Sequence, residues 1–265
     1  MYYDIYNDYT KEYRQGAYKI SHTRHKIQLD KNFSLSTRRF GDNYNLYFSR
    51  KGVLSCLIEY RFDLVNKISK VTRYLYTYIK DQYITMIIGH DLITNMLTEK
   101  IEFDYNADNQ IAEERITSYY HTGAILQETE CNHYYKDNYH MMQHYDATEE
   151  VEHIFETWYN GETGEVELKI KKEDGSFTDW IKKTYDKSGH LVRQCHFHEN
   201  GTIWCESEYF YTRNKIVQMD YGEKKEVYET LIDFDKKHNW SRKSHFKNGE
   251  LNYVEEQTIE YYAPL

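Results

Sequence analysis

The run Cys195-His196-Phe197-His198 holds the residue types best suited to metal chemistry. If it forms a β-strand, His196 and His198 lie on one face about 7 Å apart, because side chains alternate between the faces of a strand. Two imidazoles at that separation can bind a transition metal when a third ligand joins them. Three nearby residues are candidates for that third ligand: His190, Glu206 and Glu208.

A half-solvated strand gives the same alternation of polar and apolar residues. The sequence has 13 His, so neighbouring imidazoles also arise by chance. We therefore predict no metal site and no cofactor, and keep His196 and His198 as the weak candidates. A metal-dependent enzyme that uses these two residues remains a third functional hypothesis.

Alternation also argues against other catalytic arrangements. Cys195 and His196 are adjacent, so on a strand they point to opposite faces and cannot form a nucleophile–base pair. The same geometry separates the members of each acidic pair: Glu113-Glu114, Glu149-Glu150 and Glu255-Glu256. The sequence contains no glycine-rich phosphate loop, no G-x-S-x-G and no H-E-x-x-H. We predict a protein that is not an enzyme and has no catalytic residues.

Turn signals divide the chain into short runs of six to ten residues that are rich in aromatic and β-branched side chains. This pattern is typical of an antiparallel meander. We predict an all-β fold, an extended meander of stacked hairpins that forms an open twisted sheet or a solenoid. The predicted turns use five glycines: Gly52, Gly123, Gly189, Gly201 and Gly249.

Aromatic-Asp pairs recur along the chain. Their aromatic residues are Phe62, Phe103, Tyr145 and Tyr185, at intervals of 41, 42 and 40 residues. A near-constant interval indicates a repeated unit, which we interpret as two hairpins. The next pair begins at Phe234, 49 residues further on, so an additional turn is expected near 220–222.

The turn at Asn200-Gly201 can be assigned a register from the apolar residues beside it. A three-residue loop places Cys195 opposite Cys205 and Phe197 opposite Ile203, which collects apolar side chains on one face. A two-residue loop would mix apolar and charged positions, because a slip of one residue exchanges the two faces.

At Asn248-Gly249 the two-residue loop is the better choice. It pairs Phe246 with Leu251 and Arg242 with Glu255. An opposite-charge pair across a ladder contributes about 0.2–1 kcal/mol.

Residues 1–45 fit the repeat least well. Residues 6–15 are compatible with either a short helix or an edge strand, and 19–29 form a basic segment that we interpret as a solvated edge strand. In a stacked array the terminal unit has a face without a neighbour, so we expect 1–45 to be an N-terminal cap. We expect 46–265 to be the hairpin array, continuous with the cap.

Composition narrows the classes of partner and compartment. The chain of 265 residues has a net charge of −9, which argues against nucleic acid because binding to phosphates rests on Lys and Arg. The 29 Tyr residues offer large contact areas for a protein interface. No apolar segment typical of a signal peptide or membrane span follows Met1, and the four Cys lack C-x-x-C spacing. We predict a cytoplasmic protein that does not bind membranes.

The segment from Tyr185 to Val192, YDKSGHLV, resembles the turn of an RHS-type YD repeat. The segments 119–125, 197–203 and 246–251 are similar to the bacterial variant MORN repeat, with an aromatic residue, a short polar run, glycine and an aliphatic residue. The resemblance implies stacked β-hairpins without shared catalytic residues. Such families include toxin shells and small cytosolic antidotes, and this chain is too short for a shell.

These observations favour a non-catalytic binding protein with a protein partner. The more specific hypothesis is a bacterial immunity protein that occludes a basic secreted toxin through an acidic, Tyr-rich β surface. The alternative is a carbohydrate- or envelope-binding repeat protein.

Overall fold

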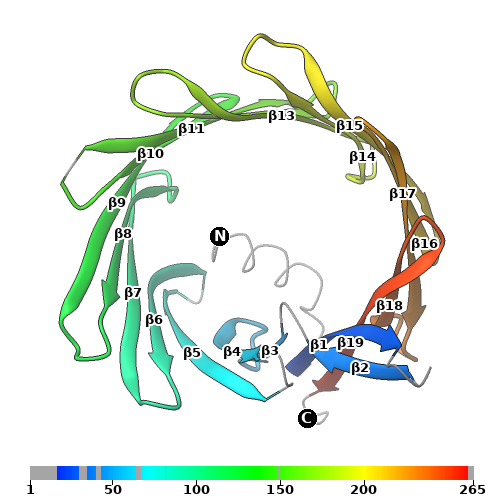
Figure 1. Cartoon of the computed structure of the whole chain (residues 1–265). Helices are drawn as coiled ribbons and strands as arrows, with labels where there is room; N and C mark the ends of the chain where they lie inside the picture. The colour runs from blue at the N-terminus through cyan, green and yellow to red at the C-terminus, as the bar shows by residue number, and fades with distance from the viewer. Residues whose placement is uncertain are drawn as a thin grey trace.

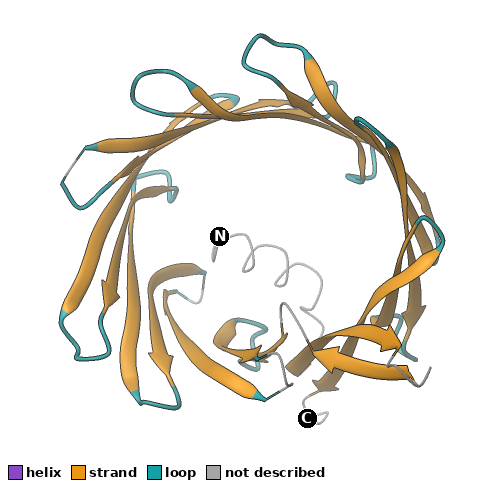
Figure 2. Cartoon of the chain, in the orientation of Figure 1, coloured by secondary structure: helices purple, strands orange, loops and turns teal. Residues whose placement is uncertain are grey.

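The computed structural model describes residues 17–29, 35–39, 43–63, 67–80, 82–148 and 150–261 as one closed antiparallel β-barrel, seen in Figure 1 as a ring. The question of helix or strand over residues 6–15 lies outside the described residues. Figure 2 shows strands joined by turns throughout the described chain. No helix in these ranges has the length and hydropathy needed to cross a bilayer.

The strands follow one another around the ring almost entirely in chain order. Their bounds are β1 (Ala17–Leu29), β2 (Leu35–Arg39), β3 (Asn43–Phe48), β4 (Leu54–Phe62), β5 (Ile68–Ile79), β6 (Tyr83–Asp91), β7 (Met96–Tyr105), β8 (Ile111–Tyr119), β9 (Ile125–Lys136), β10 (Tyr139–Tyr145), β11 (Val151–Asn160), β12 (Glu165–Lys171), β13 (Phe177–Tyr185), β14 (Leu191–Phe197), β15 (Ile203–Thr212), β16 (Lys215–Tyr221), β17 (Lys225–Phe234), β18 (Trp240–Lys247) and β19 (Glu250–Tyr261).

Strand β1 closes the ring. One edge of β1 pairs with β19, and the other pairs with β3 near its start and with β2 near its end. Because β2 and β3 share one place, the 19 strands fill 18 positions, an even number that lets every neighbouring pair be antiparallel. The predicted all-β antiparallel meander is present, but the predicted open sheet or solenoid is wrong. The expected edge strand at 19–29 is also wrong, because β1 has partners on both sides.

The two faces of the sheet differ sharply in burial. The pairing register traces one set of side chains continuously around the ring. Among the described residues, this set holds every buried hydrophobic residue except Cys195 and Val254. Side chains converge on the concave side of a closed sheet and diverge on the convex side, so we assign the buried set to the lumen. The core cluster, including Ile20, Leu46 and Ile87, lies on this lumen face of β1 and β3–β8.

Nine hairpins share one turn design. The last residue of the first strand pairs with the residue six positions later, as Tyr185 does with Leu191. The next backbone N–H donates to the carbonyl four residues on, as Asp186 does to His190 at 2.8 Å. The nine pairs are Phe48–Leu54, Phe62–Ile68, Tyr105–Ile111, Tyr119–Ile125, Tyr145–Val151, Lys171–Phe177, Tyr185–Leu191, Phe197–Ile203 and Phe234–Trp240.

Each of these nine turns is followed by a β-bulge, which we call the turn bulge. The bulge residue is the second residue of the second strand. After the Tyr185–Leu191 pair, for example, Val192 has no opposite partner and Arg193 pairs with Thr184, so the register moves by one. The five predicted turn glycines all have positive φ, between 76° and 85°. Four of them lie in these five-residue turns, and Gly249 lies in a two-residue turn with Asn248.

The bulges explain two errors of register. Phe197 pairs with Ile203 as predicted, but Cys195 pairs with Glu206, because the bulge displaces the rest of the ladder. Cys195 and Cys205 consequently occupy opposite faces. The same applies beyond Asn248-Gly249: the Phe246–Leu251 pair is confirmed, whereas Arg242 pairs with Glu256 in place of Glu255.

The repeated unit is three strands long, whereas two hairpins, or four strands, were predicted. Phe103 lies inside β7, and Tyr105 occupies the equivalent turn position. The equivalent turns after β4, β7, β10 and β13 are therefore separated by three strands, an odd number, so successive turns lie at alternate ends of the barrel. The longer interval before Phe234 contains four strands, and the predicted additional turn is present between β16 and β17.

A buried charge cluster lies at the closing seam. The guanidinium Nε of Arg24 on β1 donates to Glu255 on β19 at 2.9 Å, and His245 Nε2 lies 3.3 Å from the same carboxylate. Burial by itself would raise the pKa of Glu255, but the hydrogen bonds from His245 and Arg24 outweigh it and lower the pKa to about 2. The carboxylate is therefore charged at every pH at which the barrel is normally handled.

Replacing Gly189 by Ala tests the shared turn. Gly189 has φ +82° and open space around its Cβ position, so the cost comes from the backbone conformation alone. We expect the Gly189→Ala variant to lose about 1 kcal/mol of unfolding free energy in urea denaturation. Gly161→Ala is the matched control, since Gly161 also has open space but no positive φ, and it should have little effect. Equal losses in both variants would contradict the assignment.

The seam makes stability depend on acid. Because the folded pKa of Glu255 is below the unfolded value of about 4.5, its contribution is present above pH 4.5 and is lost as the pH falls toward 2. We expect Glu255→Gln to lower the unfolding free energy by about 3 kcal/mol at pH 7, and the gap to wild type to close below pH 4.5. Denaturant titrations at pH 7, 4.5 and 3 measure this, and parallel pH profiles would refute it.

Candidate functional site

The structure places the two histidines predicted as weak metal candidates, His196 and His198, apart from the acidic residue Glu206. His196 lies on the lumen face of β14, and the rings of His196 and His198 both approach Trp204, with centroids 5.3 and 6.5 Å away. Glu206 lies on the outer face, where it accepts a hydrogen bond from Arg193 at 2.7 Å. Glu208 also lies on the outer face, and His190 lies in the turn after β13 with its Nδ1 3.3 Å from the Asp186 carboxylate. The carboxylate that lies 3.8 Å from His196 Nδ1 belongs to Asp179, which was not among the expected third ligands.

A group of titratable side chains lies on the lumen face away from His196 and His198. A cavity of about 720 Å³ runs over β7–β12. Its walls combine apolar and aromatic side chains with four imidazoles and two carboxylates. The residues that the following analysis uses are Glu114, Cys131, His133, Tyr135, His140, His144, Glu152, His153 and Phe155.

Three of these residues form a chain of polar contacts, which we call the Glu-His-His relay. His133 Nδ1 lies 3.0 Å from His140 Nε2, and Glu114 Oε1 lies 3.1 Å from His133 Nε2. The Glu114 contact has ion-pair distance but lacks hydrogen-bond geometry, so His133 Nε2 is buried with no hydrogen-bond partner among the described residues. The His133 side chain is only 6% exposed. The Glu114 carboxylate is therefore the polar group that His133 Nε2 faces.

The pKa of His140 lies below its ordinary value, mainly because the ring is buried. Burial lowers the pKa of His140, the neighbouring His133 lowers it further, and the Glu114 carboxylate acts in the opposite direction. Its ring also stacks on Tyr135, with centroids 4.5 Å apart. The cavity therefore presents a neutral imidazole beside an aromatic surface.

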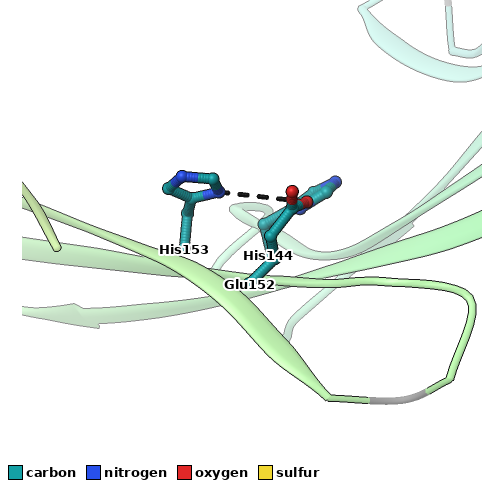
Figure 3. A group of neighbouring side chains, drawn as sticks. All are labelled: His144, Glu152 and His153. Carbon is teal, nitrogen blue, oxygen red and sulfur yellow. Dashed lines mark ion pairs between the residues drawn. The ribbon is translucent and has the colours of Figure 1, made fainter. Parts of the chain in front are cut away.

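The second group is the His-Glu-His cluster on the β10–β11 hairpin, shown in Figure 3. Glu152 Oε2 lies 3.2 Å from His144 Nδ1 and 3.9 Å from His153 Nδ1. His144 pairs directly with His153, and Tyr145 pairs with Val151, so Glu152 is the turn-bulge residue. The bulge lets Glu152 and His153, adjacent in sequence, reach the same point.

The cluster was not predicted from the sequence, because the prediction assumed that side chains alternate strictly between the two faces of a strand. Strict alternation places adjacent residues on opposite faces, and by that rule Glu152 and His153 cannot cooperate. The signal that was available is the spacing from the turn. Tyr145-Asp146 marks the hairpin, and the bulge then follows at the seventh residue, as it does in the other eight hairpins.

The cavity thiol is not a nucleophile. Burial, together with a smaller effect of the Glu114 carboxylate, raises the pKa of Cys131 to about 12. All four cysteines are free thiols. Cys131 therefore contributes to the wall as a small apolar side chain.

Comparison with known proteins gives a family match over a short segment and a structural likeness over most of the chain. Residues 172–221 match the family described as Protein of unknown function (DUF2963). No curated protein matches the chain. The chain resembles the crystal structure of a porin-like protein from Bacteroides uniformis, with TM-score 0.50, 9% identity and coverage of 92% of this chain and 98% of that one. At this identity the likeness shows the fold alone.

Two further structures align with lower scores. A porin-like protein from Bacteroides vulgatus aligns with TM-score 0.34 and 10% identity, over 94% of this chain and 100% of that one. The TcdB2-TccC3 structure aligns with TM-score 0.29 and 9% identity, over 86% of this chain and 16% of that one. Scores this low carry no argument about this chain. The YD-repeat and MORN-repeat resemblances gain no support from these matches.

His133 and Glu114 should have opposite effects on the pKa of His140. His133→Gln removes the nearby imidazole charge, so the pKa of His140 should rise. Glu114→Gln removes the carboxylate, so the pKa should fall further below its ordinary value near 6.5. Titration by NMR of the His140 ring protons measures both shifts. His121→Gln, in an exposed turn, is the control and should leave the titration unchanged. Shifts of the same sign in the two relay variants would contradict the coupling.

Proposed function

We propose that this chain is a non-catalytic binding protein that takes a segment of a protein partner into its lumen. The observation that carries the proposal is the lumen-face cavity, whose walls combine aromatic rings with four imidazoles and two carboxylates. Cavities of this size that combine aromatic walls with a few polar groups are typical binding sites.

The closed sheet favours the lumen over the strand edges. Strands β1 and β3–β19 each pair on both sides, so their backbone groups are already used in the ladder. Addition of a partner strand, a common mode of recognition by open sheets, is thus blocked along them. Barrels with 16 to 18 strands are wide enough to leave an aqueous channel, and a helix with its side chains measures about 10–12 Å.

The cavity chemistry suits a basic or amide-bearing side chain as the anchor. Glu114 and Glu152 supply carboxylates, and Tyr135 and Phe155 supply ring faces on which a cation can rest. The net charge of −9 favours the approach of a basic partner over long range. These features support the hypothesis of an immunity protein that occludes a basic toxin, by enclosure of a toxin segment.

Charges on both faces support a barrel that works in water. On the outer face Lys182 pairs with Glu165 at 2.9 Å and Lys169 with Glu167 at 3.0 Å, both within strands. On the lumen face Arg24 pairs with Glu255. A Lys or Arg facing lipid at mid-membrane costs about 2–4 kcal/mol, so this pattern favours an aqueous compartment, which we propose is the cytoplasm.

Two adjacent tyrosines on opposite faces of β9 test whether the partner binds in the lumen. Tyr135 lies on the cavity wall, and the adjacent Tyr134 lies on the outer face with 47% of its surface exposed. Wild type, Tyr135→Ala and Tyr134→Ala are immobilised and used to capture partners from extracts of the organism that encodes the chain. We expect wild type and Tyr134→Ala to retain one stoichiometric basic protein, and Tyr135→Ala to bind it at least tenfold more weakly.

Other outcomes distinguish the alternatives. Loss only with Tyr134→Ala would move the interface to the outer face and refute the lumen mode. Binding of purified polysaccharide, with no protein retained, would favour the carbohydrate- or envelope-binding hypothesis. Circular dichroism and urea denaturation of both variants exclude loss of fold as the cause.

A further inference from the structure

We infer that the His-Glu-His cluster is a site for one divalent transition metal ion, with zinc as the best match. His144 and Glu152 each offer one ligand atom, as does His153, and the three atoms lie within 4.8 Å of one another. Two imidazole nitrogens and one carboxylate oxygen form a ligand set that zinc accepts at about 2.0–2.2 Å. Tetrahedral bonds of that length place ligand atoms about 3.3 Å apart. The Glu152 contacts of 3.2 and 3.9 Å are close to this spacing, and the two imidazole ligand atoms lie no more than 4.8 Å apart.

The turn bulge gives this site its geometry, and the residue at the bulge differs from the one found in other hairpins. At four other bulges the extra residue is Ser or Thr, and its hydroxyl donates to a backbone carbonyl across the turn, as Ser55 does to Tyr47 at 3.0 Å. The three further cases are Ser69 to Arg61, Thr178 to Ile170 and Ser241 to Asp233. A carboxylate cannot donate such a bond, so Glu152 has no equivalent structural role. Of the nine bulges, only the β10–β11 bulge combines a carboxylate with two flanking imidazoles.

The charge environment also favours a cation. Within the described chain, Glu152 has ion-pair distances to His144 and His153 only, and no Lys or Arg lies at ion-pair distance from it. No permanently charged side chain of the described residues therefore competes with a divalent ion for this carboxylate.

The position of the cluster determines what the ion can reach. All three residues line the same cavity as the Glu-His-His relay. Zinc with three protein ligands keeps a fourth position open, whereas structural zinc usually has four protein ligands. Because all three residues line the cavity, a further ligand from solution can reach an ion bound to them.

The test uses the full chain without a His tag, titrated with zinc chloride in a calorimeter. We expect wild type to bind one equivalent at this site. Glu152→Ser introduces the residue that other bulges carry, so it preserves the hairpin and should weaken binding at least tenfold. His153→Gln should weaken binding by at least as much. His196→Gln is the matched control, because His196 occupies the same place in the β14–β15 hairpin as His144 does in this one.

Several results would overturn the assignment. These are a wild type that binds no zinc, a Glu152→Ser variant with unchanged affinity, and a His196→Gln variant that loses as much affinity as His153→Gln. His133→Gln separates the cluster from the relay and should leave zinc affinity within twofold of wild type. Circular dichroism and urea denaturation of each variant confirm the fold, and none of these measurements depends on a protein partner.

Discussion

The pairing of β1 with β19 is the constraint on which the rest of the structure depends. It joins the first described strand to the last, turns a meander into a ring and thereby creates a lumen face and an outer face. The buried residues Ile20 and Leu46 lie on the lumen face that this closure creates. The Arg24, Glu255 and His245 cluster lies at this seam, so buried charge and barrel closure are coupled.

The turn bulge is the second organising element. An uninterrupted antiparallel ladder places neighbours in sequence on opposite faces, and a bulge relaxes that rule at one position. The chain repeats the device at nine hairpins. In four of them a hydroxyl satisfies a backbone carbonyl, which is a structural use, while at Glu152 the same position brings a carboxylate to two imidazoles. One backbone feature thus serves both folding and chemistry.

The likeness to a porin-like barrel concerns the path of the backbone only. In this chain, ion pairs occur on both faces, and the lumen carries a cavity lined by four imidazoles. The relay and the His-Glu-His cluster lie on the wall of one cavity but depend on different local features: the relay on direct cross-strand neighbours, and the cluster on a bulge. Their properties can therefore be altered separately.

The sequence by itself determined the strand and turn pattern. Turn glycines such as Gly189 and Gly201, the aromatic residues before them and the alternating runs indicate antiparallel hairpins because these signals act over a few residues. It did not determine closure. Whether β1 is an edge strand or pairs with β19 depends on contacts between residues about 240 positions apart, and no local pattern reports such contacts. The site was hidden for the same kind of reason: His144, Glu152 and His153 meet only because tertiary pairing positions a bulge, whereas alternation read from sequence keeps Glu152 and His153 apart. Local residue types therefore specified the hairpins, and the ladder of the closed barrel decided which side chains share a face, a cavity and a possible ligand.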